Sequence, residues 1–173
     1  MYPARVPNTQ TTSPTAALTE RLDTLAAARR ALLAALDGIE QPQFVRRPDT
    51  PDDDHDARWS VREVLWHVAD SERCWREWAE AALRGDAVTR FQGSRRPAEL
   101  NRPPHLLEAL EEQRASTLAL LGSLGDEANL DAVHASPGRE MSILDMLDHL
   151  TNHDRDHAAQ VTVLRALPPR EER

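Results

Sequence analysis

The sequence contains very little cysteine, few aromatic residues and no long apolar run. Cys74 is its one cysteine, so an internal disulfide is excluded and the redox compartment is unconstrained. No stretch approaches the roughly 20 apolar residues that a bilayer-spanning helix needs, so we expect no membrane association. Residues 1–13 lack the apolar core of a signal peptide, and the expected location is therefore the cytoplasm.

Negatively charged residues outnumber positively charged ones. The formal net charge is −8, whereas nucleic-acid binding needs a clustered basic surface, so we expect no nucleic-acid partner. The aromatic residues number only four Trp, two Phe and one Tyr, and β-branched residues are sparse beside abundant Ala, Leu, Arg and Glu. This composition favours helices, and 173 residues suffice for one domain with a complete core.

Four amphipathic segments make up most of the chain. Capping residues, glycines and prolines at their ends predict helices over about 14–37, 60–85, 103–122 and 141–167. The residues between them are predicted to be loops, with no strand. Four such helices can close one core, so we predict an all-α four-helix bundle over 14–167, with tails at 1–13 and 168–173. The long connections permit a crossover topology and could frame a cleft.

Three histidines stand out by position. His153 and His157 are four residues apart, so on a helix they share one face, on the shoulder of the apolar stripe and beside Gln160. His67 has a similar place at the edge of the stripe of the second helix. Three inward imidazoles could bind one divalent metal ion and leave positions open for water or substrate, as catalytic sites do.

Other interpretations of the histidines stay open. An inward histidine is often only a hydrogen-bonded core residue, and spacing alone cannot bring His67 to the other two. His149, one turn before His153, could line a cleft or lie on the surface. Cys74 is too far from His67 to share an ion with it and is expected to be a packed thiol. No spacing pattern involves the remaining histidines, His55, His105 and His134.

Two segments resemble known motifs. Residues 59–72 (WSVREVLWHVADSE) and 147–161 (LDHLTNHDRDHAAQV) resemble the second-helix and last-helix motifs of the DinB/YfiT-like superfamily, in the same order and at a similar separation. The resemblance implies a bundle with a mirror variant of the up-and-down topology. It also implies a nickel or zinc site at His67, His153 and His157, and often a homodimer. Characterised relatives include thiol S-transferases and a maleylpyruvate isomerase.

Asp154 has two interpretations. With His153 and His157 it forms a His-Asp-x-x-His pattern similar to that of zinc peptidases, and as a catalytic residue it could be a general base for a metal-bound water. Alternatively it is a structural ion-pair partner. Asp154, Glu72 and Arg29 all fall within apolar stripes, and a buried charge is costly unless it is paired. We therefore predict that Arg29 pairs with Glu72 or Asp154.

The leading hypothesis is a metal-dependent enzyme, a thiol S-transferase or a hydrolase, acting on a small molecule such as a low-molecular-weight thiol. One alternative is a non-catalytic metal- or ligand-binding stress-response protein of the same fold. Another is an interaction module with a structural metal. Trp66, which projects from the apolar stripe, and Trp78 are the candidate contacts of a homodimer.

Overall fold

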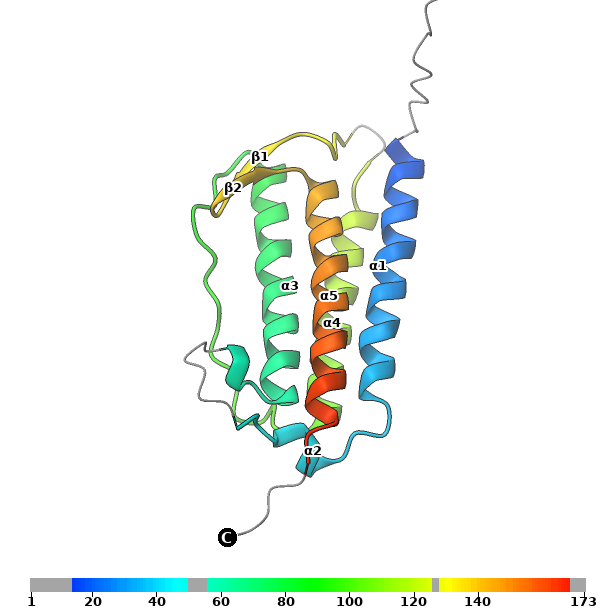
Figure 1. Cartoon of the computed structure of the whole chain (residues 1–173). Helices are drawn as coiled ribbons and strands as arrows, with labels where there is room; N and C mark the ends of the chain where they lie inside the picture. The colour runs from blue at the N-terminus through cyan, green and yellow to red at the C-terminus, as the bar shows by residue number, and fades with distance from the viewer. Residues whose placement is uncertain (1–13, 50–55, 126–127, 169–173) are drawn as a thin grey trace, which may run out of the picture.

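Four long helices dominate the computed structural model, which describes residues 14–49, 56–125 and 128–168. They are α1 (Pro14–Leu36), α3 (Val61–Leu83), α4 (Pro103–Gly122) and α5 (Ile143–Arg165), and they form the predicted four-helix bundle (Figure 1). The predicted tail at 1–13, most of the tail at 168–173 and His55 lie outside the described residues. No helix in the described part of the chain has the length and apolar character needed to cross a membrane.

Local signals account for the ends of these helices. α3 opens with the predicted capping box, in which the Glu63 carboxylate accepts from the backbone N–H of Ser60. α5 opens with a second capping box, formed by Ser142 and Asp145. Gly85, just beyond α3, has a φ of 80°, a left-handed conformation that favours glycine and ends the helix.

The helices do not follow simple up-and-down order. α1 and α5 run in one direction and pack against each other, whereas α3 and α4 run in the opposite direction and form a second neighbouring pair (Figure 1). α5 also packs against α3. The connection at residues 84–102 returns along the bundle, which lets α4 start at the same end as α3. The crossover topology that the long connections were predicted to permit is therefore present, and the connection between α3 and α4 makes it.

Two of the predicted loops contain regular structure. Residues 41–58 include the short helix α2 (Gln41–Val45) and a 3₁₀ turn (Asp56–Arg58), and Phe44 of α2 is fully buried. The expectation of no strand is also wrong, because β1 (His134–Ser136) and β2 (Arg139–Met141) form an antiparallel hairpin before α5. Strands of three residues are too short to produce a readable alternation of apolar and polar side chains.

The core has an apolar cluster towards each end of the bundle. One cluster includes Leu25, Trp78 and Leu147, and the other includes Leu32 and Leu65. Trp78 is only 1% exposed, so the prediction that it contributes to a dimer contact is wrong. Its indole N–H donates to the carbonyl of a hairpin residue, which satisfies the polar end of this large core side chain.

Candidate metal centre

The structure brings the three predicted histidines together between α3 and α5. Nε2 of His153 lies 3.0 Å from Nε2 of His67 and 3.1 Å from Nε2 of His157. The three candidate ligand atoms all lie within 4.8 Å of one another. When one ion binds two nitrogens at about 2.05 Å, the nitrogens are about 2.9 Å apart if the nitrogen–metal–nitrogen angle is a right angle. They are about 3.3 Å apart if that angle is tetrahedral. Both distances from His153 Nε2 therefore fit a shared ion.

Helix geometry and packing position each ring. His153 and His157 are one turn apart on α5, and their rings meet edge to face with centroids 4.4 Å apart. α3 packs against α5 and places the His67 ring 5.0 Å from that of His153 and 5.1 Å from that of His157. All three side chains are half-buried. The cluster therefore sits at the edge of the core, where solvent can still reach it.

Hydrogen bonding and burial favour the metal-binding form of two of the rings. Nδ1 of His157 lies 2.7 Å from Oε1 of Gln160, an acceptor that favours the tautomer with the proton on Nδ1 and the lone pair on Nε2, the atom that faces His153. Burial, followed by the neighbouring His157 and His67, lowers the pKa of His153 to about 3. The His153 ring is therefore neutral at neutral pH, which is the form that binds metal.

Two further groups approach His67, and neither contact was predicted from the sequence. The ring of Trp59 lies 4.8 Å from the His67 ring, and the Ser71 hydroxyl is 3.5 Å from His67 Nε2. Ser71 is one turn after His67 on the same helix, a spacing that could have predicted the contact. Trp59 precedes the helix cap, and only the folded chain shows that its ring packs on the histidine.

The other described histidines and Cys74 lie outside this cluster. His149 stacks on His153 with centroids 5.8 Å apart, and burial lowers its pKa, but it is not among the converging ligands. His105 bonds the carbonyl of Glu99, and His134 lies in β1. Cys74 is buried and its thiol donates to a backbone carbonyl, which confirms the predicted packed thiol; burial raises its pKa.

A buried layer of four charged side chains crosses the bundle next to the histidines. Arg29 bonds Glu72 at 2.6 Å and Asp154 at 2.9 Å, so the predicted ion pair is confirmed, and it involves both carboxylates rather than one of them. Arg114 of α4 bonds the same two groups, at 2.7 and 2.9 Å. Arg114 was not predicted, although its place between the buried Leu110 and Thr117 on one helix face was a signal. The layer ties α1, α3, α4 and α5 together at the level of His153.

Trp66, the other predicted dimer contact, is half-buried. Its indole N–H donates to the carbonyl of Ser94 at 3.2 Å, so the loop before α4 covers part of the ring. The homodimer remains a prediction.

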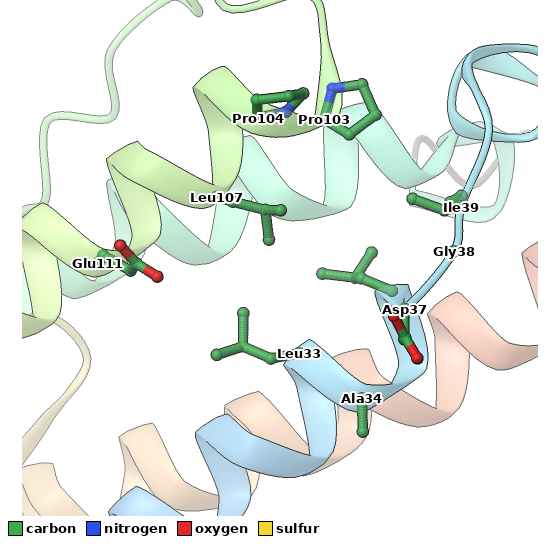
Figure 2. Close-up of a pocket in the computed structure, with 10 residues that line it drawn as sticks. Leu33, Ala34, Asp37, Gly38, Ile39, Pro103, Pro104, Leu107 and Glu111 are labelled. Atoms are coloured by element: carbon green, nitrogen blue, oxygen red, sulfur yellow. The ribbon is translucent and has the colours of Figure 1, made fainter.

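A separate cavity of about 520 Å³ lies between the end of α1 and the start of α4. Figure 2 shows Leu33 and Leu107 facing each other across it. Its wall is mostly apolar, with carboxylates at Asp37 and Glu111 and no histidine. This cavity therefore lacks the nitrogen ligands of the histidine cluster and is not the candidate metal centre.

Fold and cluster together define the class of protein: a four-helix bundle with three histidines gathered between two of its helices. The chain belongs to the DinB superfamily, whose family model matches residues 24–161.

Solved structures share the fold. YfiT from Bacillus subtilis, described as a probable metal-dependent hydrolase with an unusual four-helix bundle topology, is 20% identical, with a TM-score of 0.65 over 94% of this chain and 91% of that chain. A DinB-like protein from Bacillus cereus ATCC 10987 is 18% identical, with a TM-score of 0.53 over 87% of this chain and 89% of that one. No curated protein matches this chain.

Proposed function

We propose that this chain is a divalent-metal-dependent enzyme that acts on a small molecule, with His67, His153 and His157 as the metal ligands and nickel or zinc as the ion. The observation that carries the proposal is the convergence of three imidazole Nε2 atoms from two packed helices. Three protein ligands leave coordination positions open, which is typical of catalytic metal sites. The description of YfiT as a probable metal-dependent hydrolase supports the same type of chemistry here.

Two reactions fit this centre equally well in chemical terms. A divalent ion held by three imidazoles lowers the pKa of a bound water towards neutrality and deprotonates a bound thiol. The same nitrogens would therefore serve a hydrolase, whose nucleophile is water, or a thiol S-transferase, whose nucleophile is a low-molecular-weight thiol. The description of YfiT supports the first reaction, and the resemblance of the two histidine motifs supports the second.

Asp154 has a positioning role in this proposal. Arg29 occupies both of its carboxylate oxygens, and Arg114 bonds one of them as well. A carboxylate whose two oxygens are engaged by two guanidinium groups is fixed in position. Asp154 would thus hold the stretch of α5 that carries His153 in register with α3. Its role as a general base remains the less well supported prediction.

Metal analysis of the purified protein tests the ligand set. We expect about one divalent ion per chain in the wild type and its loss in His67→Ala and in His153→Ala. His105→Ala, which removes an exposed histidine outside the cluster, is the matched control and should keep the ion. A stoichiometric ion retained in His67→Ala or in His153→Ala would refute the assignment of that ligand.

Turnover tests the reaction. The metal-loaded protein is assayed with ester and amide substrates for hydrolysis, and with pairs of a small thiol and an electrophile for S-transfer. Activity that disappears with the ion and with His153→Ala would support the enzyme. A bound ion that accepts neither added thiol nor other exogenous ligand, without turnover of either class, would instead support the non-catalytic binding role.

A further inference from the structure

A polar cavity of about 390 Å³ lies beside the histidine cluster, between β2 and the first half of α5. Arg139 of β2 and His149 of α5 both line it. Both also pack on Trp75: the Arg139 guanidinium carbon is 5.9 Å from the Trp75 ring centroid, and the His149 ring centroid is 4.8 Å from it. One buried aromatic residue therefore holds a cation and an imidazole on the wall of the same cavity.

Arg139 and His149 have no hydrogen-bond partner for their side chains among the residues that the structure describes. Two carboxylates on the same wall are already engaged. Asp145 accepts from the backbone N–H and hydroxyl of Ser142, and Asp148 pairs with Arg21 at 3.2 Å. The uncommitted hydrogen-bond donors of the cavity therefore include Arg139, whose guanidinium has five N–H groups, and the His149 ring, beside the amide N–H groups of Asn152, whose oxygen accepts from Arg155.

His149 connects the cavity to the histidine cluster. Its ring stacks on that of His153, with centroids 5.8 Å apart and planes 30° apart, while His153 Nε2 takes part in the converging set. A small molecule with one end at the three Nε2 atoms could therefore extend past His149 into the cavity. The two features are adjacent parts of one surface on α5.

We propose that this cavity is the recognition subsite of the enzyme and that it binds a carboxylate of the substrate through Arg139 and His149. The proposal rests on the proposed function, because it places the reacting end of the substrate at the three histidines. A planar guanidinium matches a carboxylate with two parallel hydrogen bonds. A phosphate dianion fits less well, because Glu140 on the same wall is an exposed carboxylate without an ion pair among the described residues.

Hydroxamate binding to the cobalt-loaded full chain tests the subsite, with visible absorption of the cobalt as the readout. Acetohydroxamate and succinohydroxamate share the metal-binding group, but only the second carries a carboxylate. We expect wild type to bind succinohydroxamate at least about tenfold more tightly, as one charge-assisted pair allows. Arg139→Gln should remove this preference, whereas Arg139→Lys, which keeps the positive charge, should retain part of it. Glu140→Gln should increase the preference because a repelling charge is lost.

Controls separate the possible failures. Arg30→Gln removes an equal charge from an exposed position of α1 outside the cavity and should leave the preference unchanged. Unchanged acetohydroxamate binding in Arg139→Gln shows that this variant is folded with an intact centre. Equal binding of both hydroxamates by the wild type, or equal weakening of both by Arg139→Gln, overturns the subsite and leaves the proposed function standing. Failure of the wild type to bind cobalt overturns the proposed function itself.

Discussion

Arg29 holds Asp154 with two hydrogen bonds, from Nε to Oδ2 at 2.9 Å and from Nη2 to Oδ1 at 3.1 Å. Asp154 directly follows His153, so the contact joins α1 to the part of α5 that carries the candidate ligands. The same Arg29 reaches Glu72 of α3, five residues after His67. The spacing between the helices that carry the three histidines is therefore set in part by a buried ionic layer.

The ionic layer predicts that replacing a buried glutamate of α3 lowers the stability of the protein more than replacing an exposed glutamate of the same helix. Glu72→Gln leaves Arg29 and Arg114 buried with one carboxylate between them, so we expect the free energy of unfolding of the metal-free protein to fall by about 3–5 kcal/mol. Glu77→Gln breaks an exposed pair with Arg73 and should cost less than about 1 kcal/mol. Urea denaturation measures both. Equal losses in the two variants would show that the buried layer adds nothing beyond a surface pair.

The Gln160 side chain should control metal affinity without touching the ion. Gln160→Leu removes the acceptor of the His157 Nδ1 proton, so the ring loses its fixed tautomer and orientation, and we expect divalent-metal affinity to fall about 10- to 100-fold. Gln160→Glu keeps an acceptor and should retain most of the affinity. Thr162→Ala, an exposed change on the same helix, is the control. Wild-type affinity in Gln160→Leu, measured by competition with a chelating dye, would contradict this role.

Metal binding should stabilise a bundle that is already folded. At a free metal concentration of 100 times Kd, the free energy of unfolding should rise by about 2.7 kcal/mol, because the ion binds the native state alone. The wild type should show this increase as a higher Tm, and His153→Ala should not. A chelator should leave helical circular dichroism intact, because both apolar clusters are complete without a metal. Unfolding of the wild type by the chelator would instead indicate a structural metal.

The capping box of α5 predicts that part of the stability of the protein depends on pH. Hydrogen bonds from the Ser142 backbone and hydroxyl lower the pKa of Asp145 below its ordinary value, so its contribution to stability is fully present above about pH 4 and is lost as the pH falls through the pKa in the folded protein. Asp145→Ala should cost about 1 kcal/mol at pH 7 and progressively less in acid. Asp156→Ala, an exposed change within the same helix, is the comparison. A cost of Asp145→Ala that does not change between pH 7 and pH 3 would exclude this explanation.

Features that depend on nearby residues could be predicted from the sequence. The four helices begin and end close to the predicted positions, because capping residues such as Ser60 and the glycine after α3 act within a few residues. His153 and His157 lie on one face because the helical repeat places residues four apart one above the other. The pairing of Arg29 with Asp154 followed from the cost of burying an unpaired charge.

Contacts between distant segments were decided only by the tertiary structure. His67 and His153 are 86 residues apart, and the spacing of residues along the sequence does not show whether α3 packs against α5. Arg114 joins the ionic layer because α4 runs parallel to α3, an arrangement that the connection at residues 84–102 permits but does not dictate. The sequence alone thus determined the helices and the faces on which the histidines lie. Packing decided which faces meet, because burial of apolar surface is optimised over the whole molecule rather than within any one helix.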